Sequence, residues 1–201
     1  MWHCVATQPE KLKTLTKWFL PSREAFDKLR AYLLSSPVVA SVDAMVTLAF
    51  AKIAIHKISF GSLGTMAGSS ICQTAIDRRW SATSICKQID KLHAVLKRTN
   101  IRITNGDFAA LIEDQKPALL FLDPPYFARG GECYQHSFTM DDHVRLAHTL
   151  QATRHPWVMT YDDCHSIGSL YAGWTDIEVI QAPYTLAKPV MKTELLISSR
   201  V

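Results

Sequence analysis

Asp123, Pro124, Pro125 and Tyr126 form the segment of this chain best suited to chemistry. They follow the apolar run Leu119–Leu122, which is typical of a buried strand, and the prolines end that strand because they cannot donate a ladder hydrogen bond. In an open α/β sheet, ligands bind beyond the carboxyl ends of the strands. A carboxylate and backbone carbonyls there can accept hydrogen bonds from an exocyclic amino group, and a tyrosine can stack on its ring. The segment therefore predicts a site for a planar base that carries an NH2 group.

A second set of candidate residues suits contact with a polyanion. Asp77, Arg78, Arg79 and Trp80 place two cations beside an aromatic ring, a combination that can contact both a phosphate and a base. Upstream, the stretch 59–70 carries three of the eight glycines, and small residues let a backbone lie close to a ligand. Two plainer interpretations stay open, namely a solvated basic turn with a packed tryptophan and an ordinary surface loop.

The first half of the sequence has the apolar spacing of helices. This spacing predicts helices within residues 9–34, with a break at Pro21 and an N-cap at Ser22, and further helices over 42–58 and 81–97. The helix over 42–58 is apolar throughout, so we expect it to be buried.

From residue 101 onward the pattern alternates between strands and helices. The expected strands are 101–104, 119–122, 157–161, 177–180 and 194–198, and the expected helices are 108–112, 141–150 and 167–171. Thr139 or Asp141 would cap the helix over 141–150. The alternation predicts the α/β class, with a mostly parallel sheet and helices on its faces.

The composition is that of an ordinary globular protein. Of the 201 residues, 48% are hydrophobic and 20% are charged, which allows one large domain or a domain with an inserted lobe. The net charge of +4 permits a polyanionic partner without requiring one. The five cysteines form no C-x-x-C pair and the histidines have no ligand spacing, so we predict neither a disulfide framework nor a metal site.

The sequence also predicts where the protein acts. No apolar run reaches the about 20 residues that a membrane-spanning helix needs, and the first residues do not form a signal peptide. Scattered free cysteines agree with a reducing compartment. We therefore expect a cytoplasmic protein with no membrane partner.

At Asp123–Tyr126 the chain resembles the DNA adenine-N6 methyltransferases of the D12 class, the Dam-like group. The resemblance rests on an ordered set of segments along most of the chain. These are Ser59–Gly68, Asp77–Trp80, Ile103–Phe108, Asp123–Phe127, Ser137–Thr139, Asp142–His143 and Val158–Tyr161. It implies a Rossmann-like, S-adenosylmethionine-dependent methyltransferase sheet with a mainly helical inserted target-recognition lobe. Residues 1–41 would be the helical part of the methyltransferase domain, 42–100 the recognition lobe, and 101–201 the catalytic α/β part.

The same resemblance assigns catalytic roles to the strand-end segment. Asp123 and the Pro124 carbonyl would hold the adenine N6 amino group, Pro125 would rigidify the turn, and Tyr126 would stack on the flipped base. The base must leave the duplex to be reached, at a cost of a few kcal/mol that stacking partly offsets.

The resemblance also implies a methyl donor and a DNA partner. Asp107 and Phe108, together with Asp123, would line the site of S-adenosylmethionine. Double-stranded DNA would be the partner. The residues expected to contact it are Lys57, Ser59, Arg78, Arg79 and Trp80.

One part of the family pattern is missing from this sequence. The family binds its donor with a glycine-rich F-x-G-G-like turn after the first strand and an acid after the second, and no glycine here precedes Gly61. We therefore expect the N-terminal strands of the sheet to be missing. Two explanations stay open: a truncated or degraded family member that is inactive alone, which we favour, and one half of a split enzyme whose second chain supplies these strands. Two other functions stay open: a non-catalytic DNA-binding remnant or complementing subunit, and an RNA methyltransferase.

Overall fold

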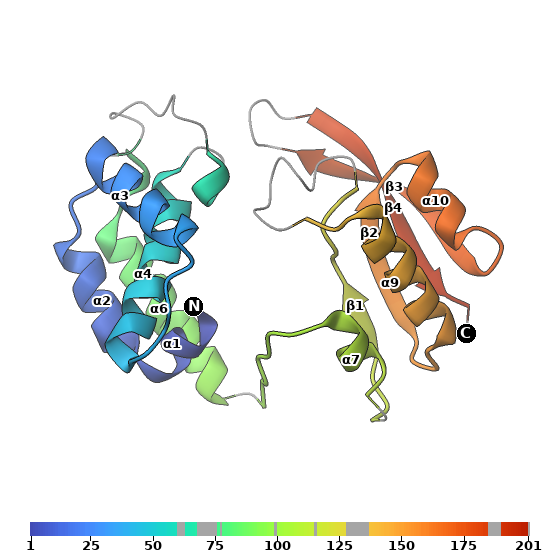
Figure 1. Cartoon of the computed structure of the whole chain (residues 1–201), viewed down its shortest axis with the longest axis horizontal. Coiled ribbons are helices and arrows are strands. Elements are labelled where there is room, and N and C mark those ends of the chain that lie inside the picture. Colours follow the sequence, from blue (N-terminus) through green and yellow to red (C-terminus); the bar gives the residue numbers. More distant parts are fainter. Residues whose placement is uncertain are drawn as a thin grey trace. The chain divides into compact units, whose positions relative to one another are not determined.

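The computed structural model of the chain consists of two compact units, Met1–Thr104 and Asn105–Val201 (Figure 1). We call them the helical unit and the sheet unit. The residues that the structure describes are 1–59, 63–67, 76, 78–98, 100–114, 116–127, 137–184 and 190–200. Residues 1–41 and most of the segment 42–100 share the helical unit. Which of them contact DNA stays a prediction.

The helical unit is built from helices of the expected lengths, with one addition. Its elements are α1 (Trp2–Thr7), α2 (Pro9–Trp18), α3 (Arg23–Leu34), α4 (Val42–Ile58), the 3-10 turn η2 (Gly64–Met66) and α6 (Ala82–Arg98). The predicted N-cap at Ser22 is confirmed, because its hydroxyl oxygen accepts a hydrogen bond from the Ala25 amide at 3.0 Å. Helix α1 was not predicted, since it has only six residues and no side-chain cap.

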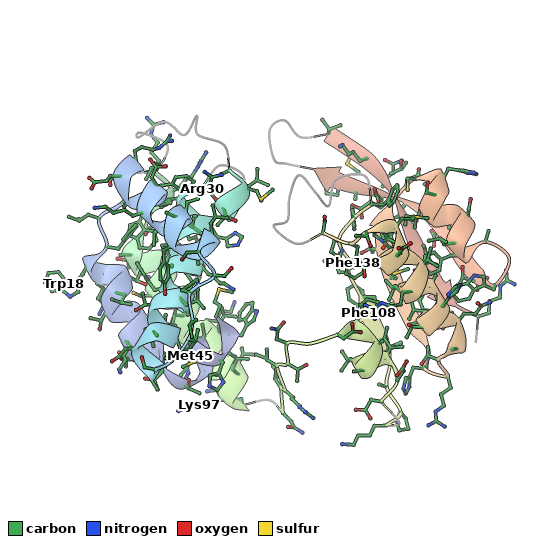
Figure 2. The ribbon with its side chains drawn as sticks, in the orientation of Figure 1. Trp18, Arg30, Met45, Lys97, Phe108 and Phe138 are labelled. Atoms are coloured by element: carbon green, nitrogen blue, oxygen red, sulfur yellow. The ribbon has the colours of Figure 1, made fainter. Side chains whose placement is uncertain are left out.

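Helix α4 is the central element of this unit, as its apolar sequence predicts. It contributes Phe50 to the cluster of buried residues shared with α1, α2 and α6, and Ile55 to a second cluster shared with α3. A helix with apolar residues on all sides is stable only when neighbours cover it on all sides. In contrast, Trp18 at the end of α2 is 81% exposed and points away from the helices (Figure 2).

The sheet unit alternates between strands and helices, as predicted. Its elements are α7 (Phe108–Ile112), β1 (Leu120–Leu122), α9 (Met140–Ala152), β2 (Trp157–Asp162), α10 (His165–Tyr171), β3 (Thr175–Tyr184) and β4 (Val190–Ser199). The predicted cap at Thr139 is confirmed as part of a capping box with Asp142. The strand expected over residues 101–104 is wrong. Ile101 and Ile103 are about half exposed, and neither pairs with a described strand. The preference of β-branched residues for strands depends on packing against neighbouring strands, so these residues alone do not form one.

The expectation of a mostly parallel sheet is also wrong for the described strands. Their order is β1-β2-β4-β3, in which β1 pairs with β2 in parallel while β2–β4 and β3–β4 are antiparallel. The reason is the short link between β3 and β4. A parallel connection needs a crossover of about a dozen residues or more, and only residues 185–189 separate these two strands.

One face of the sheet carries the core of this unit. Alternate residues of β2, Trp157, Met159 and Tyr161, are buried against α9 and α10. On the other face Phe121 of β1 is 73% exposed. Among the described residues of this unit, helices therefore cover only one face of the sheet. The expectation of helices on both faces is wrong for these residues.

A candidate base-binding site at the carboxyl end of strand β1

The segment Asp123–Tyr126 lies where the sequence predicts, directly after β1. Because β1 and β2 are parallel, their carboxyl ends meet at one edge of the sheet. Asp123 is exposed, whereas both prolines and Tyr126 are half-buried. The Phe127 amide donates a hydrogen bond to Oδ1 of Asp162, at the end of β2, over 3.0 Å. The turn is thus fixed to the neighbouring strand while the Asp123 carboxylate stays open to a ligand.

Two further strand residues act on the hydroxyl of Tyr126. Thr160 of β2 and Glu194 of β4 both influence its ionisation. Burial is the main reason that the pKa of Tyr126 is raised to about 12, and the negative charges of Glu194 and Asp123 raise it further, against the opposite effect of Thr160. Tyr126 is therefore uncharged at neutral pH, which suits a stacking ring and excludes a tyrosinate base.

A continuous row of rings joins this turn to the start of α7. The Tyr126 ring lies 6.1 Å from that of Tyr161, which lies 5.6 Å from His143, and Phe138 connects His143 to Phe108 with centroid separations of 5.4 and 5.5 Å. Phe108 and Phe138 are labelled in Figure 2. The structure therefore places the two predicted site segments, 107–108 and 123–126, on one packed aromatic row.

His143 is the buried polar member of that row, with 1% of its surface exposed. Its Nδ1 is hydrogen-bonded to the Tyr161 hydroxyl, and its Nε2 has no hydrogen-bond partner among the described residues. Burial lowers the pKa of His143, although the carboxylates of Asp162 and Asp142 act in the opposite direction. The imidazole is therefore held neutral and serves to order the row.

Removing the hydroxyl group should affect the free energy of unfolding differently at two buried tyrosines. Tyr161→Phe breaks the bond to His143 and leaves buried polar groups unpaired, so the free energy of unfolding should fall by about 1–2 kcal/mol. The Tyr171 hydroxyl is buried without a partner among the described residues, so Tyr171→Phe should leave that free energy unchanged or raise it by up to about 1 kcal/mol. Equilibrium urea unfolding measures both. Equal losses in the two variants would contradict the assignment.

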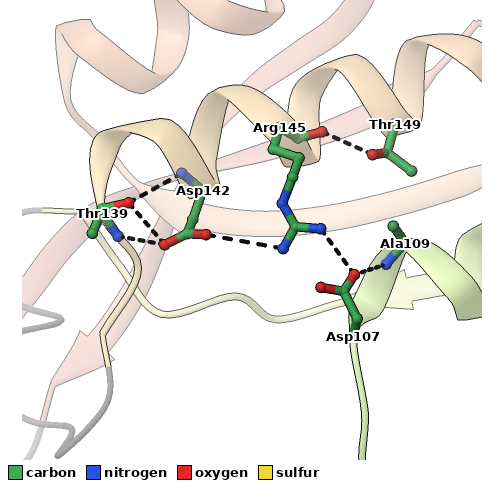
Figure 3. Close-up of polar contacts among 6 residues, drawn as sticks. All are labelled: Asp107, Ala109, Thr139, Asp142, Arg145 and Thr149. Carbon is green, nitrogen blue, oxygen red and sulfur yellow. Dashed lines mark hydrogen bonds and ion pairs between the residues drawn. The ribbon is translucent and has the colours of Figure 1, made fainter.

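The predicted donor-site acid Asp107 is held by a polar network (Figure 3). Its Oδ1 accepts hydrogen bonds from the Ala109 amide at 2.8 Å, as the N-cap of α7, and from Nη1 of Arg145 at 2.9 Å. The Arg145 guanidinium also lies 4.1 Å from the ring centroid of Phe108. These contacts lower the pKa of Asp107, chiefly through Arg145. The carboxylate therefore stays ionised and its direction is fixed.

Asp142 belongs to the same network, because Arg145 also lies close to its carboxylate. It accepts hydrogen bonds from the backbone amide and the hydroxyl of Thr139, and the amide is the main cause of its lowered pKa. A carboxyl whose folded-state pKa is lowered stabilises the fold at pH values above its ordinary pKa of about 3.9, and this contribution is lost as the pH falls through the lowered value.

The capping box therefore predicts a pH-dependent effect on stability. Asp142→Ala should lower the melting temperature at pH 7, and the difference from the wild-type chain should shrink as the pH falls from about 5 towards 2. Circular dichroism on heating measures it. Asp141→Ala is the matched control, because Asp141 is an exposed neighbour that makes none of these bonds. A difference that stayed constant down to low pH would show that the Asp142 charge is not responsible.

Two of the predicted DNA contacts lie at the end of α4 and already have internal partners. Lys57 donates a hydrogen bond from Nζ to the side-chain oxygen of Gln88 at 3.1 Å. Ser59 is buried, and its hydroxyl oxygen accepts a bond from the amide of Gly64, whose φ of 59° lies in the left-handed region that favours glycine. Ser59 thus shapes the backbone at this point, and its contact with DNA stays a prediction.

The basic segment is described in part. Arg78 is exposed, Arg79 is half-buried, and the Trp80 ring packs at 4.8 Å from Phe19 and 6.5 Å from Phe50. Trp80 is therefore a packed tryptophan, as the plainer of the two interpretations predicted. Residues 60–62, 68–75 and 77 lie outside the described residues, and they include most of the glycines of the stretch 59–70. The role of the two arginines at DNA stays a prediction.

The described residues show neither a metal site nor a membrane-spanning helix. The described part of the chain contains no cluster of three or more His, Cys, Asp or Glu side chains that could hold a metal ion. Among its helices, none is both long enough and apolar enough to cross a membrane.

Fold and site together define an α/β protein with an aromatic and carboxylate site at a strand end. Residues 69–186 match the family described as D12 class N6 adenine-specific DNA methyltransferase. The match covers more than half of the chain and includes both predicted site segments. The chain therefore belongs to this family, which confirms the resemblance noted in the sequence and implies a Rossmann-like methyltransferase fold. No curated protein matches it.

Sequence reasoning assigned no role to the residues around the turn. Asp162 accepts a bond from the Phe127 amide, Thr160 and Glu194 influence the pKa of Tyr126, and Arg145 contacts Asp107. Thr160 lies within a segment that carries the resemblance, but its role follows only from the strand register. Glu194 and Arg145 lie far along the chain from their partners, so no spacing rule connects them.

Proposed function

We propose that this protein transfers a methyl group from S-adenosylmethionine to the N6 atom of an adenine flipped out of duplex DNA. The observation that carries the proposal is the exposed Asp123 carboxylate beside the half-buried Tyr126 at the end of β1, within the region that matches the family. A carboxylate can accept from an exocyclic amino group, and a neutral tyrosine ring can stack on the base that carries it.

The residues at the start of α7 fit an adenosine-containing donor. Phe108 is half-buried, so part of its ring remains open to a ligand, and Asp107 is an ionised acceptor beside it. Arg145 fixes both through its ion pair and its contact with the ring. In the proposed function Asp107 and Phe108 hold the adenosine part of the donor, and Asp123 borders the transferred group. When bound, S-adenosylmethionine supplies an electrophilic methyl group on a sulfonium.

The chemical task of the turn is to make N6 a better nucleophile. The lone pair of N6 is delocalised into the adenine ring, so the nitrogen must be held and its hydrogens drawn away from the ring plane. Asp123 and the Pro124 carbonyl do this as fixed acceptors, and Pro125 limits their movement. Catalysis by such groups is mainly positioning and electrostatics, because the acceptors are oriented before the reaction begins.

DNA contact is assigned to the helical unit. Its basic side chains include the exposed Arg78 and the half-buried Lys57, which can reach DNA phosphates. Phosphate contacts position the duplex, and the flipped base then stacks on Tyr126, which offsets part of the few kcal/mol that unstacking costs. In this arrangement the segment 42–100 acts as the target-recognition lobe.

A transfer assay with tritiated methyl donor tests the proposal. The wild-type chain is incubated with labelled S-adenosylmethionine and either duplex DNA free of adenine methylation or structured RNA. We expect label in the DNA and none in the RNA. Label in the RNA alone would assign the protein to RNA methylation. Binding of DNA without any transfer, checked by titration calorimetry with S-adenosylmethionine, would assign it to the non-catalytic DNA-binding proteins.

A further inference from the structure

Tyr126 and Phe127, at the end of the candidate turn, pack on two buried side chains from other elements. The Tyr126 ring lies 6.1 Å from the ring of Tyr161 in β2, with 30° between the ring planes. The Phe127 ring lies 5.4 Å from the imidazole of His143 in α9. His143 and Tyr161 are joined by a hydrogen bond between Nδ1 and the hydroxyl group. Both rings of the turn therefore lie on one bonded pair, His143 and Tyr161, which we call the supporting pair.

The supporting pair is enclosed by its neighbours. Tyr161 is fully buried, and 1% of His143 is exposed. The imidazole also packs against Phe138 at 5.4 Å. Directly after Tyr161, Oδ1 of Asp162 accepts a hydrogen bond from the Phe127 amide at 3.0 Å. Close-packed side chains of this kind have little room to move, so the pair gives the turn a rigid base.

Packing alone does not account for a histidine at this position. Nε2 of His143 is buried without a hydrogen-bond partner among the described residues. An unpaired buried nitrogen is unfavourable, and a phenyl ring would fill a similar space without that cost. Proteins keep such unfavourable groups chiefly at functional sites. What the imidazole adds to a phenyl ring is the bond that holds the Tyr161 hydroxyl.

We propose that His143 and Tyr161 are positioning residues, which hold the turn so that the Tyr126 ring is presented to the flipped base. The proposal rests on the proposed function, because it assigns Tyr126 to base stacking. Neither side chain of the pair reaches the surface, so each acts through the turn residue that packs on it. A ring that is already held in one orientation loses less conformational entropy when the base binds.

The first experiment reads the Tyr126 ring in the absence of DNA and methyl donor. The tyrosines are labelled with carbon-13 at Cε, and the Tyr126 signal is assigned by its loss in Tyr126→Phe. His143→Phe keeps a ring beneath Phe127 but removes the bond to Tyr161, so we expect the Tyr126 signal to shift. Tyr171→Phe is the matched control, because the Tyr171 ring also lies near Tyr161, at 6.5 Å, while its buried hydroxyl has no partner among the described residues. The Tyr126 signal should stay in place in that variant.

The second experiment separates positioning from stability, at a temperature at which every variant is folded. His143→Phe and Tyr161→Phe should each lower kcat for methyl transfer to duplex DNA by about 3- to 10-fold, the range that one hydrogen bond contributes. The dissociation constants for S-adenosylmethionine and for DNA should not change, and Tyr171→Phe should keep full activity.

The double variant of the supporting pair gives the sharpest comparison. It lacks both polar partners, so its melting temperature should lie above that of Tyr161→Phe. Its kcat should nevertheless stay as low as in the single variants, because the same bond is missing in all three. Stability and activity should therefore change in opposite directions between Tyr161→Phe and the double variant.

The outcomes separate this proposal from the proposed function. An unmoved Tyr126 signal in His143→Phe overturns the positioning role whatever the activity. A shifted signal with unchanged kcat also overturns it, as does a double variant that regains kcat together with its stability. A wild-type chain that transfers no methyl group overturns the proposed function instead, and the Cε signal then still decides whether the supporting pair holds Tyr126.

Discussion

Asp123→Ala is expected to reduce methyl transfer to DNA by about 100- to 1000-fold, the usual cost of removing one preorganised group from the reacting centre. Asp123 is exposed and no hydrogen bond within the described structure depends on it, so the free energy of unfolding should not change. DNA binding should also persist, since the predicted phosphate contacts lie in the helical unit. The loss should therefore appear in kcat. Single-turnover transfer from labelled S-adenosylmethionine measures it.

The control for this variant is a second acid near the same sheet edge. Asp163 directly follows β2 and is exposed like Asp123, so Asp163→Ala removes the same charge nearby. We expect full transfer activity in that variant. Asp123→Asn keeps one acceptor oxygen and should fall between alanine and the wild type. Unchanged transfer in Asp123→Ala would show that the acid does not hold the amino group.

Tyr126→Ala is expected to weaken transfer by about 10- to 100-fold, because stacking of one base on an aromatic ring contributes roughly 1–3 kcal/mol. The effect should be larger than that of Tyr126→Phe, which keeps the ring and loses only the hydroxyl. Duplex DNA with 2-aminopurine in place of target adenines reports on the same step, since its fluorescence rises when the base leaves the stack. Tyr126→Ala should lower the population of flipped base.

An exposed aromatic residue of the same strand gives the comparison. Phe121 of β1 is 73% exposed and lies two residues before Asp123, so Phe121→Ala removes a ring without touching the turn. Transfer by that variant should stay within about twofold of the wild type, as is usual for surface substitutions. If Tyr126→Ala retained full transfer, the ring would have no part in holding the base.

Local features of the fold could be predicted because they depend on near neighbours in the sequence. Ser22 caps α3 and Thr139 caps α9 through bonds that span three residues. The apolar run before Asp123 ends at two prolines, which stop a strand wherever it lies in the fold. The position of the candidate turn followed from these rules, and the family match then confirmed the class.

Features that depend on distant pairing could not be predicted. The direction of β4 follows from its short link to β3, which outweighs the expectation drawn from alternating helices and strands. The pairing of Asp162 with Glu194 appears only once β2 and β4 are in register. Arg145 reaches Asp107 across 38 residues because α9 packs beside α7, which no local spacing rule shows. Composition suggested that Trp80 suits a base, whereas its position is set by packing against Phe19.

The product of the reaction gives the most direct measurement. Duplex DNA free of adenine methylation is incubated with the wild-type chain and S-adenosylmethionine, digested to nucleosides and analysed by mass spectrometry. Asp123→Ala is run in parallel. The account predicts N6-methyladenine with the wild-type chain and its near absence with the variant. Methylation at any other atom, or equal amounts of N6-methyladenine from both proteins, would contradict it.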